Sequence, residues 1–461
     1  MSFAANAGTV AVSAVFAAFL AFGSAAQEAA SAEGVWQAGV ARVEITPEEP
    51  LWLGGYAART KPAESALQPL WAKALALKDA SGTCAVLVTT DILGYPKDFA
   101  ERVRSRIEKA CNLPRANVML SASHTHSAPV IDATLKCIYP FDTGEEERLR
   151  AYAAKLEEAL AVLAGDALKN LAPASLHAGN GVARFAVNRR NNTEGQLTPT
   201  TSLQGPNDHA VPVLKVARPD GTLAAVVFGY ACHATVLDGY QWSGDYPGFA
   251  QAALEAQYPG STALFFAGCG ADQNPLPRRS VPLVRQYGAT LAAAVARMLE
   301  EPMAPLASKL AVAYREVDLP LESAPTEETL RERAAAASGY EQRCTEALLQ
   351  KLQQDGSLPA SYPYPVQTWR LGTQLLVALG GETVVSYAIG LKERLGQEIF
   401  VMGYANDLMA YIPSERVREE GGYEGRGAQI IYGLPAPWAA GLEERILSEA
   451  EAQAVATAGS R

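Results

Sequence analysis

Two histidines separated by one residue are the clearest chemical feature of the sequence. His124 and His126 follow the largely apolar segment 118–122, and the chain contains five histidines in all. Imidazole is a common ligand for zinc, and two rings at the end of a strand can point into one cleft. A third histidine, His233, ends the apolar run 224–232. The spacing favours a metal site about as strongly as it favours three ordinary polar loop residues.

The segments around the paired histidines predict a strand, a helix and a second strand. Residues 85–90 form a run typical of a buried strand, and apolar residues then recur at helical spacing at Phe99, Val103 and Ile107. This order is typical of an α/β fold. We expect one large catalytic domain over residues 34–447, with a mixed β-sheet flanked by helices.

Further elements follow along the chain. Strands are predicted at 39–46, 211–216, 223–228, 263–266, 371–379 and 398–402, and helices at 145–168, 247–257, 283–299, 327–354 and 384–395. Arg218-Pro219-Asp220-Gly221 is typical of a hairpin turn. A helix is expected after residue 442, with a frayed tail over 448–461. Because α/β proteins bind ligands at strand ends, the histidines are placed where a site is expected.

The first 26 residues resemble a secretory signal peptide. Residues 1–33 contain no Lys or Arg, and the apolar run 10–22 is short for a membrane span. Small residues at 24–26 allow cleavage, although a signal peptide normally begins with a basic residue. A disordered alanine-rich leader is the alternative. We expect a secreted or periplasmic protein without a transmembrane span.

Charge and cysteine content exclude several classes of protein. The net charge is −10, which argues against nucleic-acid binding and against strong attraction to anionic membranes. We expect a small-molecule or lipid substrate, with transient contact at a membrane surface allowed and no obligate protein partner. None of the six cysteines forms a C-x-x-C pair, which argues against a thiolate zinc site. Their pairing stays open.

Several short motifs, taken in order, resemble one enzyme family. They are Leu53-Gly54-Gly55-Tyr56, Ser123-His124-Thr125-His126-Ser127-Ala128-Pro129, the loop 268–275, Gly380-Gly381-Glu382 and the loop 403–411. Together they are similar to the catalytic domain of the neutral, non-lysosomal ceramidases, which are secreted zinc amidases that cleave N-acylsphingosine. The resemblance extends from Gly39 to about Gly425.

The resemblance implies a set of zinc ligands. The family's ligands correspond to His124, His233, Glu382 and Tyr411. Two imidazoles, a carboxylate and a phenol oxygen suit Zn²⁺ and leave room for a water. Without the resemblance, Glu382 would be interpreted as an acid at a helix N-terminus and Tyr411 as a half-buried aromatic.

The resemblance also implies residues that act on the substrate. His126 and Arg189 would position the amide, and Tyr423 would donate to the tetrahedral intermediate. Asp272 or Glu382 would accept the proton of a zinc-bound water. Asn274 stands where the family has a catalytic serine, and an amide cannot serve as an oxygen nucleophile. On the residues alone, Arg189 and Tyr423 fit equally well as surface loop residues.

These features predict an exported zinc-dependent amidohydrolase of an N-acylated (sphingo)lipid. Family members continue into a C-terminal β-sandwich domain, which we expect this chain to lack because it ends too early. Together with Asn274, this keeps two alternatives open. One is a zinc hydrolase of a different small amide or ester on the same scaffold, and the other is a non-catalytic metal- or ligand-binding module. The metallo-β-lactamase pattern is excluded, because Ala128 and Pro129 replace its Asp-His pair.

Overall fold

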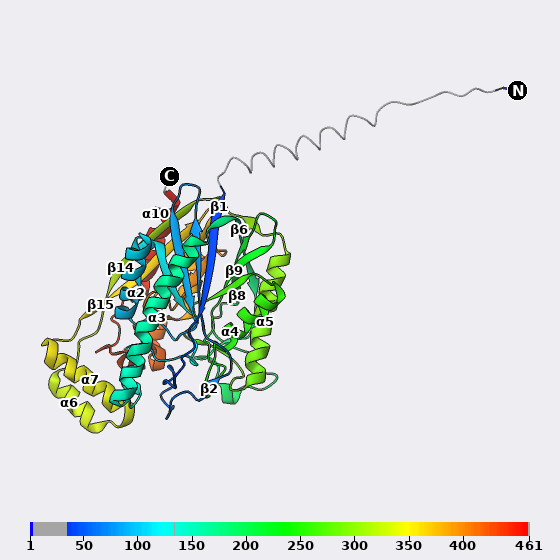
Figure 1. The fold of residues 1–461 in the computed structure, drawn as a ribbon. Coiled ribbons are helices and arrows are strands. Elements are labelled where there is room, and N and C mark those ends of the chain that lie inside the picture. Colours follow the sequence, from blue (N-terminus) through cyan, green and yellow to red (C-terminus); the bar gives the residue numbers. More distant parts are fainter. Residues whose placement is uncertain (3–34, 133, 460–461) are drawn as a thin grey trace.

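Two β-sheets packed face to face, with helices on both outer sides, form the body of the protein (Figure 1). The computed structural model describes residues 1–2, 35–132 and 134–459. Nearly all of the expected signal peptide therefore lies outside the described residues. The predicted α/β fold with a mixed sheet flanked by helices is confirmed, whereas the second sheet was not expected.

The larger sheet has nine strands. They are β1 (Trp36–Glu44), β3 (Trp71–Lys78), β4 (Cys84–Thr90), β5 (Val118–Ala122), β6 (Ala172–Val182), β8 (Ala210–Ala217), β9 (Leu223–Tyr230), β11 (Thr262–Ala267) and β13 (Ala304–Pro305). The main order is β11-β9-β8-β6-β1-β3-β4-β5, with β13 paired to β6. Strands β4 and β5 are parallel, as are β9 and β11. The predicted hairpin turn at 218–221 joins antiparallel β8 and β9.

The smaller sheet has four strands in the order β14-β15-β16-β18. They are β14 (Leu310–Pro320), β15 (Ser361–Leu371), β16 (Gln374–Leu379) and β18 (Phe400–Met402). The single strand predicted at 371–379 is wrong at its start, because the chain turns at Gly372, where φ is 58°. Leu371 is the last residue of β15, and the antiparallel β16 starts at Gln374.

The pleat of each strand sends alternate side chains into different layers. In β9, Val226 and Phe228 join the core beneath the helices, whereas Ala225 and Val227 enter the core between the two sheets. The same alternation in β16 divides its residues between the inter-sheet core and the core on the outer side of the small sheet. Strands buried on both faces need continuous apolar runs, which is why these runs are visible in the sequence.

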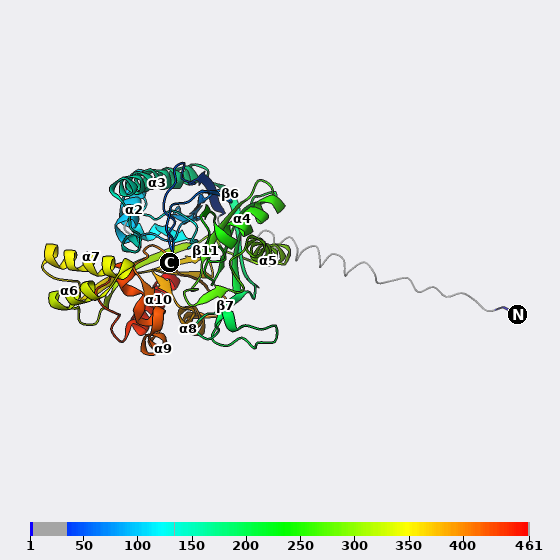
Figure 2. The ribbon, with the colours of Figure 1, turned by 90° about the horizontal axis from the view of Figure 1, so that it is seen from below.

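Helices cover the two outer faces (Figure 2). On the large sheet lie α2 (Lys97–Cys111), α3 (Thr143–Lys169), α4 (Asp245–Gln257) and α5 (Val281–Glu300). On the small sheet lie α8 (Val385–Leu395) and α10 (Leu442–Gly459). The tail expected to fray from residue 448 instead continues α10 to Gly459, with Ala450 and Ala454 buried.

A helical hairpin projects from the body beside the N-terminal end of α3 (Figure 1). The single helix predicted at 327–354 is wrong, because the chain forms α6 (Glu327–Ala336) and α7 (Gly339–Asp355). Ala337 and Ser338, between the two helices, have extended backbones, and Gly339 at the start of α7 has φ 64°, which a glycine adopts readily. A disulfide between Cys137 and Cys344 connects α7 to the body.

Short elements complete the chain. They are β2 (Ser65–Ala66), β7 (Ala186–Asn188), β10 (Gln241–Trp242), β12 (Gln273–Pro275), β17 (Glu382–Thr383), β19 (Tyr411–Ile412), α9 (Glu415–Glu420), and the turns η1 (Arg115–Asn117), η2 (Lys136–Ile138), η3 (Glu194–Gln196), η4 (Tyr423–Gly427) and η5 (Gln429–Tyr432). Among the described residues, every helix is too short or too polar to cross a membrane.

We predict that Gly229→Ala destabilises the protein. Gly229 pairs with Phe266 across β9 and β11, and an added Cβ would lie 2.1 Å from the Phe266 ring. Overpacking of this kind typically costs about 1–3 kcal/mol. The free energy of unfolding, measured in urea, should fall by that amount. Gly195→Ala is the control, because no atom lies within 4 Å of its added Cβ. Equal stability of the two variants would contradict the packing described here.

Candidate metal centre

Loops at the carboxyl ends of strands from both sheets meet at one buried point. His124 and His126 follow β5, His233 follows β9, and Glu382 follows β16. His124 Nε2 lies 3.2 Å from Glu382 Oε2, and His233 Nε2 lies 3.1 Å from the same oxygen. All four side chains are buried. The structure thus brings together residues up to 258 positions apart in sequence (382 − 124).

The hydrogen bonds of the His124 and His233 rings fix which of their nitrogens face Glu382. His124 Nδ1 lies 2.7 Å from the carbonyl oxygen of Leu93, and His233 Nδ1 lies 2.8 Å from that of Gly270. A carbonyl only accepts, so each Nδ1 must carry the hydrogen. In a neutral ring the Nε2 atom then presents a lone pair. In many proteins, a hydrogen bond from the ring nitrogen that does not bind the metal orients a metal-binding histidine in this way.

Burial lowers the pKa of two of the three histidines. Desolvation, with the nearby Arg189 charge, lowers the pKa of His233 to about 4. Desolvation, followed by repulsion from the other two rings, lowers the pKa of His126 well below its ordinary value. Burial opposes the charged form of Glu382, but its contacts with the histidines outweigh this and keep its pKa well below the usual range. Imidazole nitrogens and a carboxylate therefore converge at one buried point, and such a donor set suits a metal cation.

His126 adds a third imidazole to the cluster. Its Nε2 atom lies 3.2 Å from His124 Nε2, and the ligand atoms of the three histidines lie within 4.8 Å of one another. These three side chains could hold a metal ion. An added Cβ at Gly55 would lie 2.2 Å from His126 Nδ1, so this glycine allows the close approach of the 53–56 loop to the ring.

Tyr411 lies beside Glu382 because the short strands that contain them pair in parallel. Strand β17 pairs with β19 and aligns Glu382 with Tyr411. The Tyr411 hydroxyl lies 3.4 Å from His233 Nε2 and accepts a hydrogen bond of 3.0 Å from Arg189 Nη2. All four ligands implied by the family resemblance thus lie together, and they match the nitrogen and oxygen donors that zinc prefers.

Arg189 connects the cluster to two further loops. Its Nε donates to Glu424 Oε1 at 2.7 Å, and its Nη1 donates to Asn274 Oδ1 at 3.4 Å. Its guanidinium also lies over the ring of Tyr423, 5.9 Å from the centroid. Asn274 and Tyr423 are therefore both beside Arg189, as expected for residues of one site. Tyr423 is 51% exposed, and its ring packs edge-on against Tyr411.

Asp272 lies behind the site rather than at the convergence point. One carboxylate oxygen accepts from Asn188 Nδ2 at 3.0 Å, and the other accepts from the Val385 backbone N–H at 2.8 Å. Its backbone carbonyl accepts from the N–H of Arg189 at 2.7 Å. Asp272 thus connects Asn188 and Arg189, at the end of β7, to the first turn of α8, next to Glu382.

Four residues of the centre were not anticipated from the sequence. The Tyr432 hydroxyl donates to Glu382 Oε1, and the Tyr404 ring lies over His124 with centroids 4.2 Å apart. Buried Arg59 donates to the carbonyl oxygens of Gly54, His126 and Gly239, connecting three loops. Asp245 accepts from the backbone N–H groups of the loop after His233. No local motif marks these positions, although Tyr404 lies in a loop that the sequence singled out.

Three residues of the centre have left-handed backbones. His124 has φ 58°, Tyr404 has φ 54° and Asp245 has φ 53°. A non-glycine residue in this conformation costs about 1–3 kcal/mol and persists where its surroundings fix it. The backbone N–H of Asn406 donates to Leu120 O, and its side-chain oxygen accepts from Leu120 N–H. Asn406 thus ties the Tyr404 loop to β5, the strand that leads into His124.

The chain is similar to known proteins in sequence and in fold. Residues 36–280 match the family described as neutral/alkaline non-lysosomal ceramidase, N-terminal. Two solved structures share the fold. The first is a ceramidase complexed with C2, with a TM-score of 0.68 and 18% identity over 92% of this chain and 74% of the other. The second is the neutral ceramidase of Pseudomonas aeruginosa, with a TM-score of 0.66 and 20% identity over the same shares. No curated protein matches the chain.

We predict that the protein, purified without added metal, carries about one tightly bound transition-metal ion per chain. His124→Ala and His233→Ala should each lose the metal, because each removes a lone pair directed at Glu382. His126→Ala should largely keep it. Elemental analysis measures the metal content of the three variants. His177→Ala is the control, since this half-buried histidine lies in β6 outside the cluster. Equal metal content in His124→Ala and His177→Ala would contradict the assignment.

Proposed function

The chain belongs to the neutral/alkaline non-lysosomal ceramidase family, and on that premise we propose that it is an exported zinc-dependent hydrolase. Its substrate is an N-acylated lipid of the sphingolipid type, and the bond cleaved is the amide. Family membership and the shared fold support a ceramidase-like hydrolase. The metal identity, the substrate and the compartment are our proposal.

One observation supports this proposal most strongly. The Nε2 atoms of His124 and His233 lie 3.2 and 3.1 Å from the same carboxylate oxygen of Glu382, and all three side chains are buried. We propose that His124, His233, Glu382 and Tyr411 hold Zn²⁺. Bound there, zinc would supply a Lewis acid for the amide carbonyl and lower the pKa of a coordinated water.

Arg189 and Asn274 are proposed to bind the amide group. The guanidinium donates to Asn274 Oδ1, so the Asn274 Nδ2 group points away from Arg189 as a donor. Donors fixed beside a reacting carbonyl stabilise the oxyanion that forms during attack. Tyr423 stands on the exposed side of Tyr411, where its hydroxyl could donate to the same oxygen. Asn274 cannot act as a nucleophile.

Proton transfer is assigned to the groups that face the centre. Both carboxylate oxygens of Asp272 are engaged by Asn188 and Val385, so Asp272 is proposed as a positioning residue. Glu382 is held at Oε1 by Tyr432, and its Oε2 atom faces the histidines. Of the two carboxylates, Glu382 is therefore the one that faces the centre directly.

Export is supported by two features. The leader composition resembles a signal peptide, and the Cys137–Cys344 disulfide suits an oxidising compartment. A second candidate function, a zinc hydrolase of another small amide or ester, is favoured by Asn274 at the family's serine position. A substrate screen separates the two.

We predict that the metal-loaded protein hydrolyses N-acylsphingosines. The screen should compare several acyl lengths with N-acyl amino acids and simple esters, and it should measure the released amine or acid. Prolonged chelation should abolish turnover, and zinc should restore it. Cleavage of only the amino-acid amides or esters would favour the second candidate. Failure with every substrate would favour a non-catalytic binding module.

We predict that Arg189→Lys lowers kcat/KM by about 10²–10³-fold, the usual effect of losing an oxyanion donor. A lysine cannot reproduce the fork that contacts Glu424, Asn274 and Tyr411 together. Metal content should not change. Arg190→Lys is the matched control, because Arg190 also pairs with Glu424 but otherwise contacts Glu420 and a backbone carbonyl at Gly421. Similar rates for the two variants would refute this role of Arg189.

A further inference from the structure

A cavity of about 590 Å³ lies between the α6–α7 hairpin and the loops around the metal centre. Its walls include Ala337 and Tyr340 from the hairpin and Tyr423, Ile430 and Ile431 from the opposite side. Its volume falls in the range of small-molecule pockets, about 300–1,000 Å³. In Figure 2 the hairpin stands out from one side of the layered body, so the cavity has a wall that the two sheets do not provide.

The lining is mainly apolar and carries exposed aromatic rings. Isoleucines and alanines supply most of its side chains, and the charged groups are Arg333 and Glu341. Tyr340 is 37% exposed and Tyr423 is 51% exposed, and these are the exposed aromatic side chains among the described residues. Both border this one cavity. Exposed apolar surface gathered at a cavity indicates a binding site for an apolar ligand.

The inner wall of the cavity shares residues with the metal centre. Gly55 lines the cavity, and its backbone lies so close to His126 that an added Cβ would overlap the ring. Tyr423 lines it too, and its ring contacts Tyr411, with centroids 5.2 Å apart. One wall residue of the cavity, Tyr423, is therefore in direct contact with Tyr411, one of the proposed zinc ligands.

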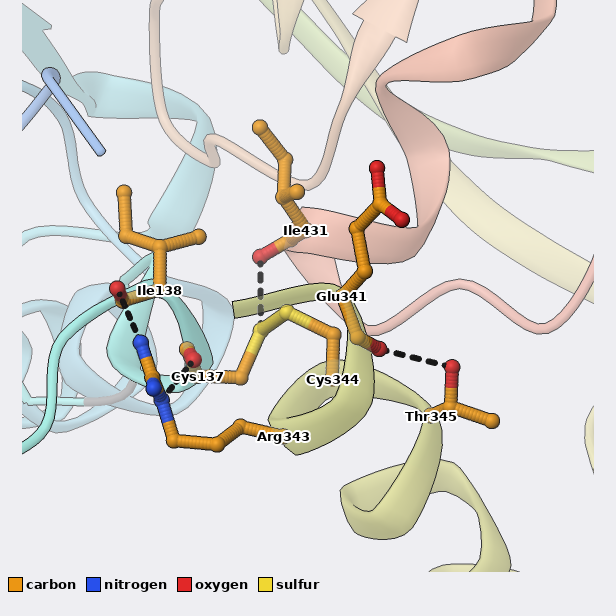
Figure 3. The surroundings of a disulfide bond; sticks show 7 residues. All are labelled: Cys137, Ile138, Glu341, Arg343, Cys344, Thr345 and Ile431. Carbon is orange, nitrogen blue, oxygen red and sulfur yellow. Dashed lines mark hydrogen bonds between the residues drawn. A yellow bond between two sulfur atoms is a disulfide. The ribbon is translucent and has the colours of Figure 1, made fainter. Parts of the chain in front are cut away.

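A covalent tether holds the hairpin wall in place (Figure 3). Cys344 of α7 is bonded to Cys137, which is 207 residues away in sequence. Arg343 reinforces the bridge by donating to the carbonyl oxygens of Cys137 at 3.1 Å and of Ile138 at 2.7 Å. Ile138 also lines the cavity. The bridge thus fixes α7 against a wall residue of the same cavity.

We propose that this cavity binds one aliphatic chain of the substrate and that the Cys137–Cys344 bridge keeps it shaped for that chain. The proposal rests on the proposed function for the identity of the substrate. It assigns chain-length selectivity to the α6–α7 hairpin, a segment that contributes no residue to the metal centre.

The first test compares substrates in Ala337→Trp, which fills the cavity, with Ala335→Trp, an exposed control on α6 that does not line it. Chain length is varied separately on the acyl side and on the sphingoid side. We expect Ala337→Trp to lower kcat/KM at least tenfold for long chains on one side, with short-chain substrates and the control variant unaffected. An equal effect on all chain lengths, or none, would overturn the proposal.

The second test needs no catalysis. Binding of 1-decanol, which has no carboxylate to contact a metal, is measured by calorimetry. We expect binding by the unmodified protein and by Ala335→Trp, a loss of binding in Ala337→Trp, and at least fivefold weaker binding in the Cys137→Ser/Cys344→Ser double variant. Absence of binding, or unchanged binding in Ala337→Trp, would overturn the cavity assignment. Unchanged binding in the double variant would overturn the role of the bridge.

The two tests separate this proposal from the proposed function. Suppose that no N-acylsphingosine is cleaved, but that decanol binds to the unmodified protein and not to Ala337→Trp. The cavity assignment then stands and the enzymatic function fails. If N-acylsphingosines are cleaved with no chain-length effect of Ala337→Trp, the function stands and the cavity assignment fails.

Discussion

The buried carboxylate of Glu382, placed against the imidazoles of His124 and His233, is the constraint around which the site is built. A buried carboxylate without a positive partner or a hydrogen-bond donor is strongly unfavourable, and the ring nitrogens that face it are also good metal ligands. Several surrounding residues keep these three groups facing one another. Leu93 and Gly270 orient the rings through backbone carbonyls, and Tyr432 holds the other carboxylate oxygen.

The two-sheet architecture explains how such an arrangement is maintained. The histidines come from the large sheet, and Glu382 and Tyr411 come from loops that follow strands of the small sheet. Neither sheet alone contains the site, so the inter-sheet core, filled by residues such as Phe266 and Trp369, sets the distance between the two halves. Asn406 bonds directly to β5 and joins the two halves at the strand ends. Stability of the core and geometry of the site are therefore coupled.

The sequence predicted most of the strands and the candidate site residues, but few of the residues that hold the site in place. Continuous apolar runs predicted β4, β9 and β11, because strands buried on both faces must be apolar throughout. His124 and His233 stood out by residue type and by their positions after such strands. Glu382 and Tyr411 were found only through the family resemblance, since an acid before a helix and a buried tyrosine are ordinary features. Tyr432 and Arg59 were missed because their roles depend on contacts across long sequence separations. The breaks before Gly339 and at Gly372 were missed, although a glycine stands at or next to each.

Anomalous X-ray diffraction at the zinc absorption edge, from crystals of the protein purified without added metal, tests the central claim most directly. The account predicts a single strong anomalous peak that contacts Nε2 of His124, Nε2 of His233 and the carboxylate of Glu382. It would be contradicted by a peak bound only by other residues. The absence of any anomalous peak at these three side chains, even after soaking with zinc, would contradict it equally.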